Sequence, residues 1–178
     1  MLSFVAPSGT GKTTLLEKTL EVLVRGGVRV AVLKASHEDH RLDVPGKDSF
    51  RFSAAGAGIV GLIGPGVSTL FLESGHADWT EVRSIGAWLA ACPVMDFDVV
   101  LCEGFSFDRD LPKLRVVRGA WPNEVWDDLV AVAWDGGERP AVLAAEVALL
   151  PLDGQSVARW IRTWAGCEPG DSESDDTR

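Results

Sequence analysis

A glycine-rich stretch with a single lysine follows the first apolar segment of the chain and constrains its fold more than any other feature. Residues 2–6 form a short apolar run, which is typical of a buried strand. The chain continues as Pro7-Ser8-Gly9-Thr10-Gly11-Lys12-Thr13-Thr14, and a helical pattern of leucines begins there. In this order of strand, loop and helix, backbone N–H groups of the loop and the first helical turn can surround a phosphate. The sequence therefore predicts a phosphate-binding loop (P-loop).

Each residue type in this loop has a chemical reason to be there. Gly9 and Gly11 allow the backbone to turn its N–H groups inward, and the positive end of the helix dipole adds to the attraction. Lys12 can bridge the β- and γ-phosphates, and the Thr13 hydroxyl can hold Mg²⁺. Ala6 replaces the first glycine of the strict GxxxxGK[ST] pattern. The alternative is a glycine-rich turn that only caps a helix; the position between strand and helix favours a site formed by Ser8, Gly9, Thr10, Gly11, Lys12, Thr13 and Thr14.

The rest of the chain alternates between strands and helices. Residues 13–25 predict a helix that Gly26 and Gly27 end, and residues 28–33 predict a second buried strand, which together make a strand–helix–strand unit. Further helices are expected over residues 48–57, 79–91 and 155–164, and further strands over 98–102, 113–117 and 129–134. This order predicts an α/β P-loop fold with a mainly parallel sheet flanked by helices.

One antiparallel excursion interrupts this order. Residues 59–63 and 67–72 flank Gly64-Pro65-Gly66, which predicts an inserted β-hairpin. Its short apolar strands can pair with a second copy of the chain, which makes the hairpin a candidate contact of a homodimer. Packing of these strands against the chain's own core is an equally favoured alternative. No linker interrupts the chain, so we expect one nucleotide-binding domain over residues 1–167.

Composition narrows the partners. The 178 residues carry a formal net charge of -9, which argues against nucleic acid and anionic membrane as partners. Residues 168–178 hold five acidic side chains and no large apolar one, which predicts a disordered acidic tail. The three cysteines have no CxxC spacing, which fits a reducing compartment rather than a disulfide framework or a zinc site. Without a signal-peptide pattern, the cytoplasm is the expected location.

Two carboxylates at strand ends are further candidates for the site. Glu103 follows an apolar strand and precedes Gly104, the place where a second acidic residue orders the water shell of Mg²⁺. Its alternative is an ordinary surface carboxylate. Asp135 follows the strand over 129–134, and a carboxylate there can accept from guanine N1–H and N2–H while repelling N1 of adenine. The alternative for Asp135 is a turn residue before Gly136-Gly137.

At this point the residues resemble a known family, the molybdopterin-guanine dinucleotide biosynthesis adapter proteins (MobB). The likeness covers the chain from Leu2 to about Val117. It lies in the combination of these blocks: Ser8 to Lys18, Val32-Leu33-Lys34, His37, Asp43-Val44-Pro45-Gly46-Lys47-Asp48-Ser49, Ala54-Ala55-Gly56-Ala57, Leu101-Cys102-Glu103-Gly104-Phe105 and Pro112-Lys113-Leu114. Ala35-Ser36 departs from the family, which often has a histidine there.

The resemblance implies a function. MobB proteins are usually dimeric, bind GTP, hydrolyse it poorly, and assist attachment of GMP to the molybdenum cofactor together with the guanylyltransferase or the insertion proteins. Carried onto this chain, Lys47 would pair with a phosphate and Asp43 would hold Mg²⁺ through water. From the residues alone, a solvated loop with a turn at Pro45-Gly46 is the preferred interpretation, and the resemblance reverses that preference.

Two other functions remain open. A P-loop small-molecule kinase would need an arginine lid, for which Arg109, Arg115 and Arg118 are the candidates. A nucleotide-binding scaffold without turnover is the third possibility, because no water-positioning glutamine or arginine finger is evident. Two common classes are disfavoured: the GTPases that carry Asn-Lys-x-Asp, and the partitioning ATPases that carry a second lysine where Pro7 stands.

Overall fold

The computed structural model describes residues 1–35, 48–72, 87–89, 91, 96–122 and 128–167. Contacts divide the chain into two compact units. The sheet unit comprises Met1–Ala35 and Trp88–Arg178, and the hairpin unit comprises Ser36–Ala87. The span 1–167, which the sequence predicts as one domain, is divided between these two units. The predicted acidic tail lies outside the described residues.

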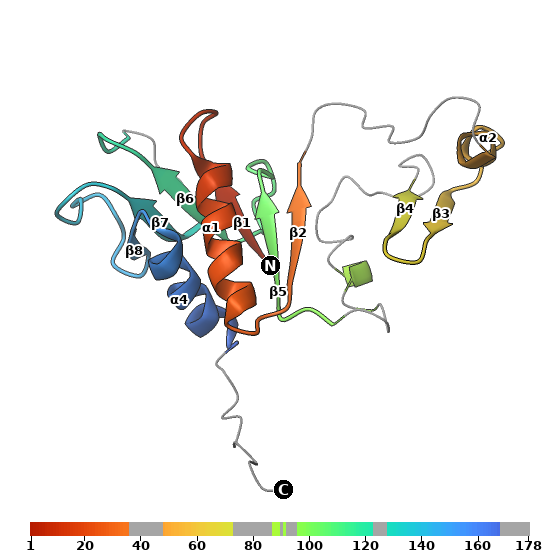
Figure 1. Ribbon diagram of the computed structural model, residues 1–178. Coiled ribbons are helices and arrows are strands. Elements are labelled where there is room, and N and C mark those ends of the chain that lie inside the picture. The colour runs from red at the N-terminus through yellow and green to blue at the C-terminus, as the bar shows by residue number, and fades with distance from the viewer. Residues whose placement is uncertain (36–47, 73–86, 90, 92–95, 123–127, 168–178) are drawn as a thin grey trace, which may run out of the picture. The chain divides into compact units, whose positions relative to one another are not determined.

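The sheet unit contains a six-stranded sheet in the order β2-β5-β1-β6-β7-β8, with every neighbouring pair parallel (Figure 1). This confirms the α/β fold with a mainly parallel sheet. The strands are β1 (Leu2–Val5), β2 (Val30–Lys34), β5 (Val99–Glu103), β6 (Lys113–Val117), β7 (Leu129–Trp134) and β8 (Ala148–Pro151).

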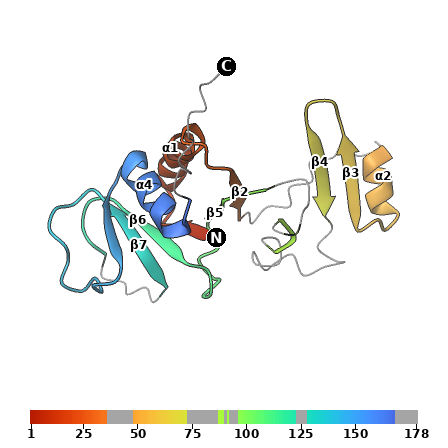
Figure 2. The ribbon, with the colours of Figure 1, turned by 90° about the horizontal axis from the view of Figure 1, so that it is seen from below.

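Two helices, α1 (Lys12–Arg25) and α4 (Gly154–Ala165), lie side by side on one face of this sheet (Figures 1 and 2). Their close approach depends on Gly154, where a Cβ would lie 2.6 Å from the Cβ of Lys18. Between helices and sheet is a core of fully or almost fully buried side chains that includes Leu2, Phe4, Leu15, Leu16, Leu23, Leu101, Leu114, Val157 and Ile161. Burial of this apolar face is the main force that holds the helices against the strands.

The strand order decides where a ligand can bind. β1 is the third strand from the β2 edge, with β5 on one side and β6 on the other. Phe4 of β1 pairs with Glu103 of β5 and with Leu114 of β6. Because parallel strands end at the same edge of a sheet, the loops after β1, β5 and β6 share that edge, where open α/β sheets bind their ligands.

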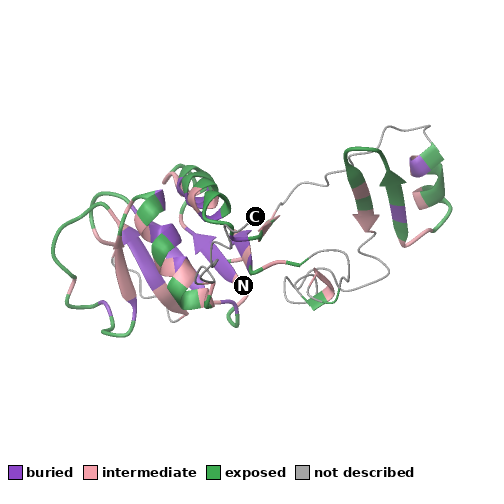
Figure 3. Ribbon diagram, turned by 60° about the horizontal axis from the view of Figure 1, so that its bottom comes forward, coloured by how far each residue is buried: buried purple, intermediate pink, exposed green. Residues whose placement is uncertain are grey.

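The hairpin unit contains the short helix α2 (Asp48–Ala54) and the strands β3 (Ile59–Ile63) and β4 (Ser68–Leu72). The two strands pair with each other, antiparallel, from Ile59 opposite Leu72 to Ile63 opposite Ser68, and within the described residues they form a sheet of two strands. The predicted hairpin is therefore confirmed, as a two-stranded sheet of its own. Figure 3 shows that most of its surface is exposed, in contrast to the buried strands of the sheet unit.

Three expectations about elements need correction. The sequence did not predict β8, which is four residues long and ends in Pro151, as an edge strand permits. Strand β2 was expected to be buried, but as an edge strand it is partly exposed, and Val32 stands open to solvent. Helix α2 ends at Ala54, three residues earlier than predicted. Most of the expected helix over residues 79–91 lies outside the described residues.

Candidate functional site

The loop between β1 and α1 has the backbone shape that binding a phosphate requires. Gly9 and Gly11 adopt left-handed conformations with φ of 78° and 90°, which side chains other than glycine's rarely allow. Within the loop, Thr10 donates through its hydroxyl to the carbonyl of Pro7 at 2.8 Å, and its backbone N–H points to the same oxygen at 3.4 Å. These two contacts with the Pro7 carbonyl close the loop into a turn.

The start of α1 presents unused hydrogen-bond donors. The first hydrogen bond at this end of the helix runs from the N–H of Leu15 to the carbonyl of Gly11. Within the described part of the chain, no residue accepts from the backbone N–H groups of Lys12, Thr13 or Thr14. Three orphan donors at the positive end of a helix dipole are an arrangement that can bind an anion such as phosphate.

Glu103 lies directly beside this helix start. Its Oε1 accepts a hydrogen bond of 2.6 Å from the Thr13 hydroxyl, and Lys12 Nζ lies 3.9 Å from the same oxygen. Only 11% of the Glu103 side chain is exposed. The structure thus brings together the lysine, the hydroxyl and the carboxylate that the sequence pattern proposed for phosphate and metal.

The turn that follows Glu103 holds the carboxylate in place. Gly104 has a φ of 94°, and a Cβ on it would lie 3.0 Å from the Cβ of Ala35, so glycine is required on two counts. Its N–H donates to the carbonyl of Phe4, and the Ser3 hydroxyl donates to the Gly104 carbonyl. Phe105, with a φ of 56°, continues the left-handed turn. The end of β5 is therefore tied to β1, the strand that carries the loop.

Lys113, the first residue of β6, fixes the end of the segment that connects Glu103 to β6. Sequence reasoning did not assign this role. Lys113 is 1% exposed, and its ammonium donates to the carbonyls of Asp108 and Leu111 and to the Asp128 carboxylate at 2.9 Å. A buried ammonium needs such partners, so this residue stabilises the segment between Glu103 and β6 rather than binding a ligand. A lysine inside an apolar strand was the available signal.

The donors at this site fit Mg²⁺. The ion prefers oxygen ligands and is usually held by one or two carboxylates or hydroxyls together with water and the phosphates of a substrate. Thr13 and Glu103 supply one hydroxyl and one carboxylate at hydrogen-bonding distance from each other. In the described residues, no group of three or more His, Cys, Asp and Glu side chains forms a metal site of its own.

Arg118 and Gly119 connect the phosphate loop to the end of β7. Arg118 Nε donates to the carbonyl of Thr10 at 3.3 Å, and a Cβ on Gly11 would lie 3.3 Å from its Nη2. The neighbouring Gly119 donates its N–H to Asp135 Oδ1 at 2.7 Å and accepts from Trp134 Nε1 at 2.8 Å. The sequence marked Arg118 only as a possible lid residue; the strand order is what places it against the loop.

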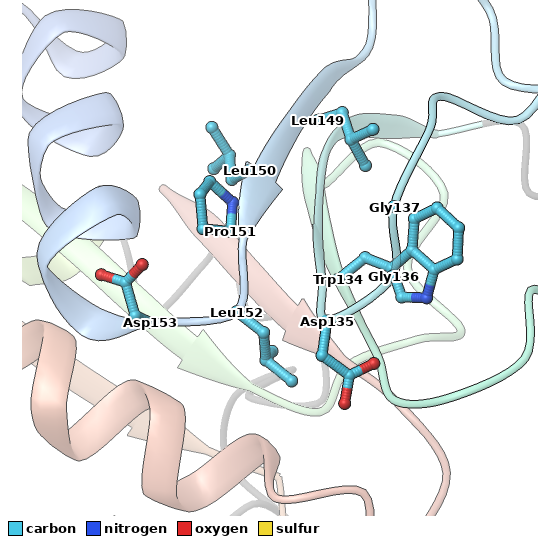
Figure 4. Close-up of a pocket in the computed structure, with 9 residues that line it drawn as sticks. All are labelled: Trp134, Asp135, Gly136, Gly137, Leu149, Leu150, Pro151, Leu152 and Asp153. Atoms are coloured by element: carbon cyan, nitrogen blue, oxygen red, sulfur yellow. The ribbon is translucent and has the colours of Figure 1, made fainter.

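Asp135 lies at the rim of a pocket of about 530 Å³ (Figure 4). The pocket is lined by the ends of β7 and β8 and the residues after them, from Trp134 to Gly137 and from Leu149 to Asp153. Asp153 also caps α4. Its carboxylate accepts a hydrogen bond from the N–H of Ser156, and this bond lowers the pKa of the carboxyl. The pocket combines apolar walls with two carboxylates, which suits a flat, partly polar ring.

The remaining candidates separate clearly. Asp43 and Lys47 lie outside the described residues, as does His37. Arg115, a candidate for a kinase lid, is instead 4% exposed within β6, so it is not available to close over a phosphate.

Cys102 and Cys167 are free thiols, and burial raises the pKa of Cys102 to about 12. Among the described residues, no helix is long and apolar enough to cross a membrane.

A parallel sheet with a phosphate loop after its first strand, and a carboxylate at the end of the adjacent strand, defines a P-loop protein of the α/β class. The particular family follows from comparison with known proteins. The family model described as molybdopterin guanine dinucleotide synthesis protein B (MobB) matches residues 1–135, and the chain belongs to this family.

Individual relatives agree. The chain is 31% identical over 170 residues to the molybdopterin-guanine dinucleotide biosynthesis adapter protein of Escherichia coli (strain K12), covering 92% of each chain. It is 45% identical over 121 residues to the protein of the same name from Haemophilus influenzae, covering 66% of this chain and 63% of that one. The crystal structure of a MobB homologue from Bacillus stearothermophilus has the same fold, with a TM-score of 0.62 at 24% identity over 94% of this chain and 98% of that one.

Proposed function

We propose that this protein binds GTP with Mg²⁺ on the loop from Ser8 to Thr14, and that it acts as an adapter in the biosynthesis of molybdopterin guanine dinucleotide. The observation that carries the proposal is the contact of Thr13 with Glu103, 2.6 Å long, at the mouth of a loop with free helical N–H groups. The adapter role rests on the printed names of the relatives.

Each residue has a defined task in this proposal. The N–H groups of the first turn of α1 bind the β-phosphate, and Lys12 neutralises the charge between the β- and γ-phosphates. Thr13 and Glu103 hold Mg²⁺, the carboxylate acting through the metal's water shell. Asp43 and Lys47 would complete the metal and phosphate contacts from their loop. Bound Mg²⁺ would supply neutralisation of the phosphate charge.

The base would occupy the pocket beside Asp135. The Asp135 carboxylate lies at the end of β7, separated from the phosphate loop by the Arg118–Gly119 connection. Its Oδ1 already accepts from Gly119, which orients the carboxylate and leaves Oδ2 to accept from guanine. Guanine presents two N–H groups on that edge, while adenine presents an acceptor, so the carboxylate favours GTP over ATP.

Turnover is expected to be slow. Fast hydrolysis needs an arginine finger or a glutamine that orients the attacking water. Among the described residues, the cations that approach the Glu103 carboxylate are Lys12 and Lys34. Arg118, the arginine beside the loop, donates to the Thr10 carbonyl, and the one glutamine of the sequence, Gln155, lies in α4. We therefore assign the site to binding, with hydrolysis at most weak.

The partners would be the molybdenum cofactor guanylyltransferase and the insertion proteins, in the cytoplasm. A homodimer is part of the proposal, with the β3–β4 hairpin as the candidate contact. Ile63 and Val67 beside its turn are 82% and 78% exposed, and an apolar surface of this kind is commonly covered in an assembly.

The test is a titration of the full chain with fluorescent GTP and ATP analogues, with and without Mg²⁺. GTP should bind more tightly than ATP, and more tightly with Mg²⁺. Lys12→Ala should weaken GTP binding roughly 10- to 150-fold, the equivalent of one hydrogen bond to a charged group. Lys18→Ala is the matched control, since Lys18 is an exposed lysine on the same helix.

Other results would count against the proposal in identifiable ways. Preference for ATP would remove the role of Asp135, and absence of nucleotide binding would overturn the proposal itself. Transfer of the γ-phosphoryl group to a small-molecule acceptor would favour the kinase. Binding without any hydrolysis would leave a nucleotide-dependent scaffold.

The base pocket has its own test. Asp135→Asn places an NH₂ donor at the position of Oδ2, the oxygen that does not accept from Gly119. A donor there suits the second carbonyl of xanthine and not the amino group of guanine. GTP affinity should fall and affinity for xanthosine triphosphate should rise. Asp153→Asn, in the same pocket but bonded to Ser156, is the control and should leave the base preference unchanged.

A further inference from the structure

A second lysine shares Glu103 with the phosphate loop. Strand β2 ends at Lys34, which lies opposite Glu103 in the register of the parallel pair. Lys34 Nζ is 3.8 Å from Glu103 Oε2, while Lys12 Nζ is 3.9 Å from Oε1. The two ammonium groups therefore approach the two oxygens of one carboxylate, from the strand on one side and from the helix start on the other.

The two lysines differ in how they are held. The Lys34 side chain is 67% exposed, whereas the Lys12 side chain is 20% exposed. An ion pair with so exposed a lysine contributes little to stability, because water and salt screen it. Fold stability is therefore a weak reason for an ammonium at this place, and a ligand is a better one.

The sheet order indicates which part of a ligand Lys34 would meet. In the order β2-β5-β1, Glu103 at the end of β5 lies between Lys34 at the end of β2 and the loop that follows β1. In the proposed complex, the loop and the first turn of α1 would enclose the β-phosphate, so the phosphate that extends from them toward Glu103 would be the terminal one. If Glu103 held the water shell of Mg²⁺, both ammonium groups would be free to pair with a phosphate instead.

We propose that Lys34 is a second phosphate-site cation that binds the γ-phosphoryl group of the nucleotide and allows the protein to distinguish a triphosphate from a diphosphate. This assignment rests on the proposed function. The loop has a single lysine, with Pro7 two residues after the last residue of β1, so the additional positive charge comes from the neighbouring edge strand. Lys12 binds phosphate in both nucleotides; Lys34 acts only on the one with a γ-phosphate.

The experiment measures the dissociation constants of Mg²⁺ with a non-hydrolysable GTP analogue and of Mg²⁺ with GDP. The proteins are the wild type, Lys34→Gln, Lys34→Arg and the control Lys18→Gln. Lys34→Gln should weaken the triphosphate roughly 10-fold, the lower end for a charged hydrogen bond because the side chain is exposed, and should change GDP binding by less than about twofold. Lys34→Arg should keep most of the preference, and Lys18→Gln all of it.

Equal losses for both nucleotides, or no loss for either, would overturn the assignment and leave Lys34 as the ion-pair partner of Glu103 only. Equal gains would overturn it too, since Lys34 would then compete with Mg²⁺ for the carboxylate. Failure of the proposed function looks different, because the wild type itself would bind neither nucleotide. Thermal melting of Lys34→Gln verifies that the variant is folded, which its exposed position predicts.

Discussion

The sheet unit and the hairpin unit differ in how far their apolar side chains are buried. In the sheet unit, all four residues of β1 and all five of β6 are buried. In the hairpin unit, four of the five residues of β3 are exposed, and β4 has no fully buried residue. The composition of the strands is similarly apolar, so the difference lies in what covers them. The sheet unit has its own core, whereas the hairpin unit presents apolar surface that a partner can cover.

The largest effect should come from matched leucine truncations. Leu114→Ala in β6 removes a fully buried side chain between the sheet and the helices and should cost about 2–5 kcal/mol. Leu70→Ala in β4, where the side chain is 44% exposed, should cost less than about 1 kcal/mol. Urea unfolding followed by tryptophan fluorescence and circular dichroism gives both values. Equal costs would mean that the hairpin is buried as deeply as the sheet.

A helix-cap substitution should have an intermediate effect. The Asp153 carboxylate accepts from the N–H of Ser156 at the start of α4, so Asp153→Ala should cost about 1 kcal/mol. Because this bond lowers the pKa of Asp153, its contribution is present above the ordinary pKa and is lost as the pH falls. Asp48→Ala, in the first turn of α2, should cost less, since its contact is an exposed pair with Arg51. Thermal unfolding at neutral and acid pH checks both.

A smaller effect is expected from the ion pair that joins β2 to β5. Arg29 donates from its guanidinium and its backbone N–H to Asp98, which lowers the pKa of Asp98 from 3.8 to about 2. Between pH 3.8 and about 2, this carboxylate is ionised in the folded state but largely protonated in the unfolded chain. Stability is therefore lost as the pH falls through that interval. Asp98→Asn should flatten this part of the pH–stability curve. Added salt should reduce the difference between the wild type and the variant, because Arg29 is exposed.

The smallest change in stability should come from the apolar tip of the hairpin. Ile63→Ser alters a side chain that is 82% exposed and should change the free energy of unfolding by less than about 0.5 kcal/mol. If the hairpin joins two copies, the same variant should lower the molar mass measured by light scattering. A wild type that is monomeric, or a variant that remains dimeric, would move the proposed contact away from β3 and β4.

Much of the fold was predictable because its signals are local. The apolar run before Pro7, the leucine spacing of α1 and the glycine-rich turn of the hairpin each depend on neighbouring residues only. The element missed, β8, has four residues and no alternating pattern, and it forms only because β7 offers an open edge. The exposure of β2 was also beyond local reasoning, since a strand's own residues do not say whether it lies at an edge.

The same distinction between local signals and long-range contacts applies to the candidate site. The residue types of the phosphate loop, and Glu103 at a strand end, could be recognised from the sequence because phosphate and Mg²⁺ demand specific donors at specific spacing. The chain separates Thr13 from Glu103 by ninety residues, and the parallel pairing of β1 with β5 is what closes that gap to 2.6 Å. Lys34 and Arg118 take their roles from partners far away in the sequence, Glu103 and Thr10, so no local pattern could assign those roles. Lys113 did carry a local signal, a lysine within an apolar strand.

By itself, then, the sequence determined the residue types of this protein's candidate site: a glycine-rich loop with one lysine followed by a threonine hydroxyl, and the motif combination that marks the MobB family. The tertiary structure decided which distant groups join that chemistry. Strand order placed Lys34 and Glu103 on one side of the loop and Arg118 and Asp135 on the other. The physical reason is that residue types carry reactivity, while only the pairing of strands far apart in the chain brings their ends to one edge of a sheet.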